Sequence, residues 1–272
     1  MKMFLIALIF FCHVALGESI QGEIYSVDIG QGREDHLLKL ESGRVIFIKS
    51  EFHPDEKLKR NIVFDFLVDK KNYLLKFKPF RDIKKIRESK QSIGFIPKPF
   101  EPTILKDNLQ AKNIFLRMRR NYTQGGQCFN RAHVWTYEEF KKNKNKLHKI
   151  FIFFTNRYIR LYRFHWWFHV SPLTYVGTSA RVLDRRYGLG PLTMKTWTDI
   201  FIKSKRSCLL VDRYSDYSNY QESQHCYLFK SSMYQLIPRD LEKLELYGEG
   251  KEYFFKNELD KAYRDAFLSR PN

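Results

Sequence analysis

The chain is poor in cysteine and in long apolar runs, and both shortages limit what it can be. Only 4 of its 272 residues are cysteine, and no Cys or His pair has the spacing of a zinc site. We therefore expect neither a metal centre nor another cofactor. Beyond residue 17, no apolar run is long enough to cross a bilayer, so no transmembrane segment is expected.

Acidic residues are also scarce relative to basic ones. The chain has 30 Asp and Glu against 48 Lys and Arg, which gives a net charge of +18. Such a charge can bind nucleic acid, and residues 141–146 form a Lys-rich run. An N-terminal export signal argues against that partner. We expect the charge to attract acidic protein substrates or an anionic cell-envelope surface.

The export signal lies in residues 1–17. Lys2 supplies a positive start, residues 4–11 form a short apolar core, and small residues follow up to Gly17. This order is typical of a cleaved secretory signal peptide. The sequence predicts a secreted or periplasmic protein and leaves the choice between the two open.

The expected export of the protein indicates how its cysteines pair. Loss of the signal peptide removes Cys12 and leaves Cys128, Cys208 and Cys226, an odd number that leaves one thiol over. Cys208 and Cys226 flank a polar, turn-rich segment. We expect a disulfide between them, worth roughly 3 kcal/mol in the chain-entropy model. Cys128 then stays free.

Two domains are expected. Short alternating segments with Gly-containing turns predict a small all-β domain, a barrel or sandwich, over residues 18–92. A Pro-rich linker at 93–104 separates it from a catalytic domain at 105–272. The expected strands of the first domain are 24–29, 36–40, 44–48, 61–68 and 72–80.

The second domain mixes helices with strands, so the predicted fold class is α+β. A helix that begins near Cys128 and runs to about residue 144 should pack on an antiparallel sheet. Further helices are expected at 106–120, 238–246 and 256–268. Strands are expected at 150–158, 164–174, 180–183 and 196–202.

Cys128, His169 and Asp184 form the candidate catalytic group. A thiol at the first turn of a helix faces free N–H groups and the positive end of the helix dipole, and both lower its pKa. His169 within a strand and Asp184 at the end of the next strand can face each other. A thiolate, an imidazole and an orienting carboxylate are what thiol acyl-transfer enzymes use.

Structural roles compete with each of these assignments. Cys128 could be a buried apolar residue, His169 a core histidine, and Asp184 a partner of the arginines that follow it. Other residues could also fill two of the roles. The alternatives are His133 and His165 as the base, and Asp199 and Asp212 as the carboxylate.

Three motifs resemble those of the bacterial protein-glutamine glutaminases. Residues 128–133 resemble their Cys-x-x-Arg-Ala-His motif, 167–172 resemble an aromatic-flanked His-Val-x-Pro motif, and 182–184 resemble a strand-end aspartate. The resemblance covers about residues 105–245. It implies a papain- and transglutaminase-like core with nucleophile Cys128, base His169 and orienting Asp184.

The resemblance also implies a function. It is that of an exported thiol hydrolase that deamidates glutamine side chains of proteins or peptides to glutamate and releases ammonia via a cysteine thioester. Candidate walls of the acyl slot are Trp135, Trp166 and Trp167. A transglutaminase, a cysteine peptidase or amidase, and a non-catalytic envelope-binding protein are the alternatives. The first domain resembles in its placement a pro-region that caps the active site in some members, and its removal stays open.

Overall fold

The computed structural model describes residues 17–52, 54, 58, 62–82, 100–123, 127–204, 206–219, 224–248 and 254–268. The predicted signal peptide, apart from Gly17, and most of the predicted linker lie outside these residues. Among the described residues, each helix is too short or too polar to qualify as a membrane span.

A five-stranded antiparallel sheet, here called the N-terminal sheet, forms the first part of the chain. Its order is β3-β2-β1-β4-β5. Its strands are β1 (Glu18–Asp28), β2 (His36–Leu40), β3 (Val45–Ile48), β4 (Ile62–Val68) and β5 (Leu74–Asp82). The five expected strands are confirmed, because period-two alternation and turn residues locate half-buried strands well.

The long strand β1 joins two halves of this sheet. Its first half pairs with β4 and its second half with β2, and a bulge lies between Ile24 and Ser26. Bulges increase the local twist of a strand. A bridge between Phe47 and Tyr73 then brings β3 close to β5. The sheet therefore curls towards a small barrel.

The second part of the chain is built on a six-stranded sheet, here called the central sheet. Five of its strands follow the order β10-β11-β7-β8-β6, and β9 pairs with β8 outside this order. The sheet is antiparallel except at β10–β11 and β6–β8. Its strands are β6 (Ile104–Leu105), β7 (His148–Phe154), β8 (Phe168–Val176), β9 (Ser179–Val182), β10 (Leu209–Val211) and β11 (Cys226–Ser231).

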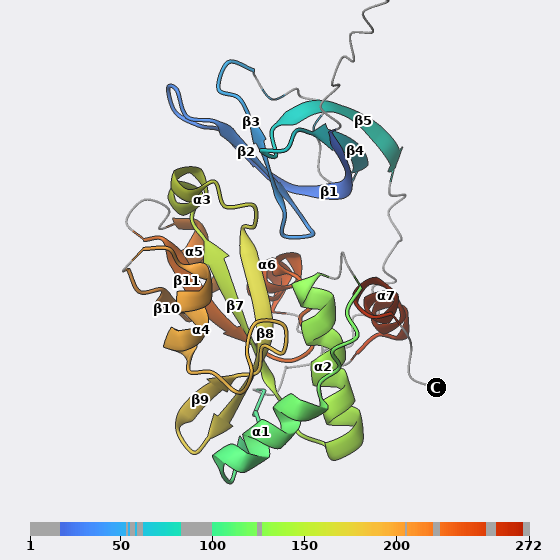
Figure 1. The fold of residues 1–272 in the computed structure, drawn as a ribbon, viewed down its shortest axis with the longest axis vertical. Helices are drawn as coiled ribbons and strands as arrows, with labels where there is room; N and C mark the ends of the chain where they lie inside the picture. Colours follow the sequence, from blue (N-terminus) through green and yellow to red (C-terminus); the bar gives the residue numbers. More distant parts are fainter. Residues whose placement is uncertain are drawn as a thin grey trace, which may run out of the picture.

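Helices cover both sides of this sheet. In Figure 1, α2 and α7 lie to the right of β8, α1 lies below it, and α3, α4 and α5 lie to its left. The helices are α1 (Asn108–Arg117), α2 (Cys128–Asn143), α3 (Asn156–Tyr162), α4 (Met194–Phe201), α5 (Tyr214–Asn219), α6 (Pro238–Tyr247) and α7 (Lys256–Ala266). The α+β class with a cysteine-bearing helix on an antiparallel sheet is confirmed.

One strand prediction is wrong in part and another is wrong altogether. The strand expected at 150–158 ends at Phe154, because the Thr155 side chain accepts a hydrogen bond from Tyr158 N and begins α3. The strand expected at 196–202 is helix α4, which Thr193 caps in the same way. Elements β6, β10, β11 and α5 were not predicted. Short apolar runs carry too little periodicity to tell a strand from a helix.

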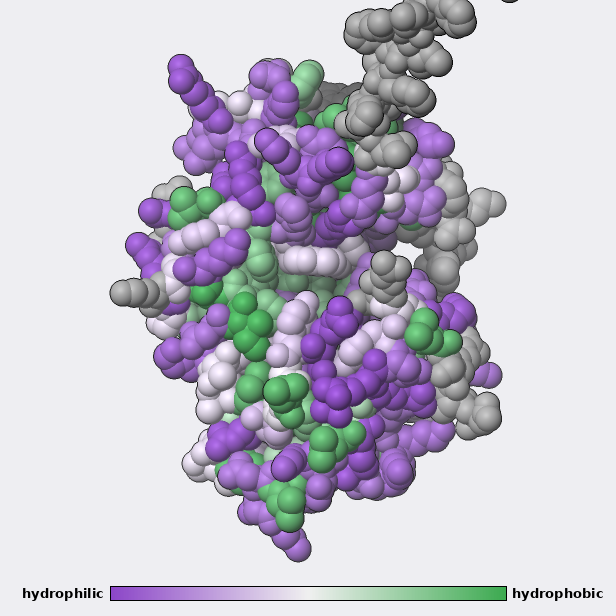
Figure 2. Space-filling model, in the orientation of Figure 1, coloured by the Kyte–Doolittle hydropathy of each residue, from purple (hydrophilic) through white to green (hydrophobic). Residues whose placement is uncertain are grey.

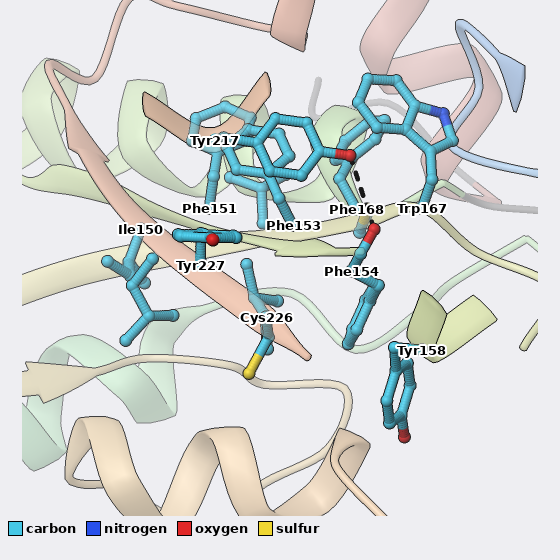
Figure 3. Packing of buried hydrophobic residues seen from close by; sticks show 14 of the residues in the cluster. Ile150, Phe151, Phe153, Phe154, Tyr158, Trp167, Phe168, Tyr217, Cys226 and Tyr227 are labelled. Carbon is cyan, nitrogen blue, oxygen red and sulfur yellow. Dashed lines mark hydrogen bonds between the residues drawn. The ribbon is translucent and has the colours of Figure 1, made fainter. Parts of the chain in front are cut away.

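An aromatic core packs against the central sheet and includes residues of the N-terminal sheet. Phe151, Phe153 and Trp167 are fully buried in it. Figure 3 shows Tyr217 across these side chains, with its hydroxyl donating to the Phe154 carbonyl at 3.4 Å. Leu37, Val45 and Phe47 of the N-terminal sheet belong to the same cluster, so the two sheets share one core.

Cys208 and Cys226 are joined by a disulfide, the pairing that the sequence predicts, and Cys128 is free. The bond ties the segment before β10 to the first residue of β11. The loop it closes spans 18 residues. Loss of the bond increases the entropy of the unfolded chain.

We therefore expect the double variant Cys208→Ala/Cys226→Ala to unfold at a lower temperature than the parent protein. In the chain-entropy model the loss is roughly 3 kcal/mol, which corresponds to about 6–12 °C. Scanning calorimetry with and without reductant measures it. Cys128→Ala is the matched control and should stay sensitive to reductant. A melting temperature that does not respond to reductant would contradict the bond.

Candidate active site

Cys128 is the first residue of α2, the central helix of the second part. The preceding residue, Gln127, is extended, and among the described residues no side chain caps this end of the helix. The first amide N–H groups of a helix lack intrahelical partners, so they are available to a negatively charged group. Cys128 is 6% exposed and borders the cleft described below.

The pairing of β8 with β9 brings the side chains of His169 and Asp184 close together. His169 is the second residue of β8, and Asp184 follows shortly after β9. Their side chains meet with His169 Nε2 2.7 Å from Asp184 Oδ2. Both side chains are buried, so this pair is shielded from water.

Two further donors hold the Asp184 carboxylate. Trp197 Nε1 donates to Oδ2 at 2.9 Å, and the backbone N–H of Arg186 donates to Oδ1 at 3.2 Å. Trp197 is fully buried on α4. A carboxylate with three partners has little rotational freedom, and it fixes the orientation of the imidazole in turn.

The electrostatics favour a thiolate–imidazolium pair. Burial raises the pKa of the Cys128 thiol, but the charge and hydrogen bond of His169 outweigh burial and leave the pKa below its ordinary value. Burial lowers the pKa of His169, but the charges of Cys128 and Asp184 outweigh it and raise the pKa to about 9. For Asp184, burial raises the pKa and the His169 charge overcomes this, so the pKa is lowered.

The alternative carboxylates and bases lie elsewhere. Asp199 is in an exposed ion pair with Lys195 at 2.7 Å, and Asp212 is exposed. His133, on the same helix as Cys128, has its Nδ1 2.9 Å from Lys149 Nζ. The ring of His165 packs against Phe47 of the N-terminal sheet. None of these four side chains borders the cleft that contains Cys128 and His169.

Cys128 and His169 open into a cleft of about 600 Å³. The cleft lies between the N-terminal sheet and the second part of the chain. Figure 2 shows this face hollowed below the N-terminal sheet, with hydrophobic and hydrophilic residues along the border. Its other lining residues are Glu18, Ile20, Gln21, Ser42, Arg44, Gln127, Arg131, Phe154, Phe164, Trp166, Arg186, Tyr187, Ile200 and Phe201.

Only one of the three tryptophans proposed as walls lines this cleft. Trp166 does so and is 41% exposed. The next residue, Trp167, does not line the cleft and is fully buried in the shared core. Trp135 lies on α2 about two turns after Cys128, where it packs against Phe267 and lines a different cavity. The expectation for Trp135 and Trp167 is corrected accordingly.

Trp197, Tyr187 and Arg131 belong to the site but were not predicted from the sequence. Trp197 binds Asp184, and Tyr187 and Arg131 line the cleft. Trp197 could have been found, because Trp197 and Phe201 are four residues apart after the capping residue Thr193, which indicates one face of a helix. Tyr187 packs edge-on against the His169 ring, with centroids 5.3 Å apart. Its position in a turn carries no sequence signal.

No metal site accompanies this group. Across the part of the chain that the structure describes, His, Cys, Asp and Glu side chains nowhere gather in threes around a point that could hold an ion.

Part of the chain matches a known protein family. Residues 103–201 match the family model described as Glutaminase. The predicted resemblance to glutaminases is confirmed, and the matched segment contains Cys128, His169 and Asp184. It supports an enzyme that removes the amide group of glutamine.

Two solved structures are similar to the chain, and both are titled pro-protein-glutaminase. A mutant form has 13% identity and a TM-score of 0.47, and covers 87% of this chain and 94% of its own. The other has 12% identity and a TM-score of 0.45, with coverage of 85% and 92%. No curated protein matches the chain.

The lowered pKa of Cys128 predicts unusual thiol reactivity in the glutaminase-like segment. At pH 6 an ordinary thiol, with a pKa of about 8.5, is almost fully protonated, so Cys128 should react with iodoacetamide at least about ten times faster. Intact mass over time measures the rate. His169→Gln should slow it to the ordinary rate, whereas Asp199→Asn should not change it. Equal rates in the parent and His169→Gln would contradict the ion pair.

Proposed function

We propose that the protein deamidates glutamine side chains of proteins or peptides by thiol catalysis. One observation carries the proposal: a thiol at a helix N-terminus and an imidazole held by a buried carboxylate border the same open cleft. The glutaminase match of residues 103–201 supports the choice of glutamine as the substrate group.

In the first half of the reaction the Cys128 thiolate attacks the carboxamide carbon. The carbonyl oxygen gains the negative charge, and the free amide N–H groups at the start of α2 stabilise it. The carbon–nitrogen bond then breaks. His169 transfers its proton to the departing nitrogen, so ammonia leaves and a thioester with Cys128 remains.

In the second half a water molecule replaces ammonia. Neutral His169 accepts a proton from the water, whose oxygen attacks the thioester carbon. The carbon–sulfur bond breaks, glutamate is released, and Cys128 returns as a thiolate beside protonated His169. The net reaction consumes one water and releases one ammonia for each glutamine.

Asp184 and Trp197 act through His169. The hydrogen bond from His169 Nε2 to Asp184 leaves the other ring nitrogen, Nδ1, for the thiolate and the substrate. Asp184 also stabilises the imidazolium and takes no proton itself. Trp197 keeps the carboxylate in place through its indole N–H.

The wider organisation of the chain is part of the proposal. We propose a signal peptide at 1–17, a small β domain at 18–92, a linker at 93–104 and a catalytic domain at 105–272. Export to the periplasm or the medium fits the Cys208–Cys226 disulfide, since such bonds persist in oxidising compartments.

The proposal predicts ammonia release without chain cleavage. A glutamine-bearing protein such as casein should gain about one dalton per modified site, because an amide nitrogen is replaced by oxygen through the thioester. Intact mass and ammonia release, measured together, test this. Crosslinked products would indicate a transglutaminase, shortened chains a peptidase, and no reaction a binding protein.

Variants separate the members of the site. Cys128→Ala and His169→Gln should each abolish ammonia release, whereas Asp184→Asn should reduce it by about 10- to 10⁴-fold, because it only orients the base. Asp199→Asn, an exposed carboxylate outside the cleft, is the matched control and should behave like the parent. Full activity in Cys128→Ala would refute the mechanism.

The pH dependence of activity follows from the shifted pKa values of Cys128 and His169. kcat/KM should rise with pH as Cys128 ionises and should fall above about pH 9, where His169 loses its proton. Asp184→Asn removes a negative charge that raises the pKa of His169. Its basic limb should therefore move to lower pH, measured with a blocked glutamine peptide. An unmoved basic limb would contradict the assignment of that limb to His169.

A further inference from the structure

Four arginines lie around Tyr122 on the rim of the cleft that contains Cys128, and they are here called the arginine group. Its members are Arg120, Arg131, Arg185 and Arg186. The guanidinium carbons of Arg131 and Arg186 lie 5.6 Å and 5.4 Å from the centre of the Tyr122 ring, and both residues line the cleft. All four arginines belong to the second part of the chain, so the group is independent of the N-terminal sheet.

Arg185 is buried without a partner of opposite charge. It is 8% exposed, and its Nε has no hydrogen-bond partner among the described residues. Its guanidinium carbon lies 4.5 Å from the centre of the Phe115 ring. Burial lowers the pKa of Arg185, and the charge of Arg120 lowers it further. A buried charge normally has an opposite charge or hydrogen bonds around it, so Arg185 lacks a partner that its burial requires.

The Tyr122 hydroxyl also lacks a partner. Its oxygen is buried, and no described residue forms a hydrogen bond with it. Burial raises the pKa of Tyr122, while the charges of Arg131, Arg185 and Arg120 act in the opposite direction. A buried hydroxyl next to buried and exposed guanidiniums is a set of donors that suits the oxygens of an anion.

Other arginines close by in the sequence differ in this respect. Arg117 and Arg119 each form an ion pair with a glutamate of α2, at 2.9 Å and 2.6 Å. Within the described part of the chain, the side chains of Arg120, Arg185 and Arg186 have no such carboxylate. The arginine group therefore carries positive charge that the side chains of the protein leave unbalanced.

Asp184 is close to the group, but its oxygens are already hydrogen-bonded. Its charge raises the pKa of Tyr122. The carboxylate accepts from His169, from Trp197 and from the backbone N–H of Arg186. One carboxylate with these three partners cannot balance four guanidiniums, so the group has room in its charge for a further anion.

Residues 120–123 are fixed to the end of α7. Thr123 N donates to the Ala266 carbonyl, and Leu268 N donates to the Asn121 carbonyl, both at 2.9 Å. The backbone that carries one arginine and the tyrosine is therefore held in place before any ligand arrives. Binding to preorganised donors loses little conformational entropy.

We propose that the arginine group and the Tyr122 hydroxyl form an oxyanion-binding site on the rim of the cleft. Planar guanidiniums donate in parallel pairs to two oxygens of one anion, and the hydroxyl donates beside them. The anion is either free in solution or a carboxylate carried by the substrate. The site goes beyond the proposed function, and only the second source of the anion rests on it.

Calorimetric titration with sodium sulfate tests the site, because sulfate stays doubly charged across the pH range of the assay. Sodium chloride keeps the ionic strength constant, since surface attraction alone is screened by salt. The parent protein should bind sulfate with a saturable heat. Arg185→Gln should weaken binding about tenfold, since it removes a buried charged donor. Arg120→Gln, at an exposed position, should weaken it roughly threefold.

Lys112→Gln is the matched control. Lys112 is exposed on α1 and is absent from the charges that act on Tyr122 and Arg185, so its variant should bind sulfate like the parent. Arg185→Lys keeps the charge and loses the planar fork, so it should bind more weakly than the parent. Arg120 lies on the surface, and its variant decides the question even where Arg185→Gln does not fold. No sulfate binding in the parent, or equal affinity in the parent and the arginine variants, would overturn the site.

Kinetics distinguish the two sources of the anion. Two blocked peptides with one glutamine should differ only in a Glu or an Ala beside it. Sulfate that raises KM for the Glu peptide alone identifies the substrate carboxylate as the ligand, whereas the same effect, or none, on both peptides identifies a free anion. If neither peptide releases ammonia, the proposed function fails, and the calorimetric result still decides the site.

Discussion

The hydrogen bond between His169 and Asp184 is the interaction on which the rest of the site depends. It joins β8 to the turn after β9 at 2.7 Å inside the protein, where water does not compete. Trp197 and the Arg186 backbone fix the carboxylate, and the carboxylate fixes the imidazole. The imidazole in turn lowers the pKa of Cys128 against the opposing effect of burial. The charge of His169 lowers the pKa of Cys128 and of Asp184, and their charges raise the pKa of His169 in turn.

The second constraint is the short segment at the start of β8. Trp167, just before the strand, is buried in the shared core, whereas Trp166 and His169, the second residue of β8, line the cleft. The same short segment therefore anchors the N-terminal sheet, carries the imidazole and forms part of a cleft wall.

Much of the fold could be predicted because its signals are local. The strands of the N-terminal sheet, the helix that begins at Cys128, and α6 and α7 all follow from periodicity and turn residues. The errors come from the segments where two signals compete. Thr155 caps a helix directly after the apolar run of β7, and Thr193 caps α4, whose sequence reads as a strand. β10 and β11 are short strands whose pairing is long-range.

The sequence by itself determined the α+β class and the free thiol at the start of a helix. Residue types and short spacings are sufficient for those, because each depends on neighbours a few positions away. The choice of Cys128, His169 and Asp184 for catalysis came from motifs that resemble those of the glutaminases. Only the tertiary structure decided that Trp166 borders the cleft while Trp135 and Trp167 are core residues, that Trp197 holds Asp184, and that β1 and the turn before β3 form a wall of the site. These contacts join residues far apart in the chain, and their geometry follows from how the two sheets share one core.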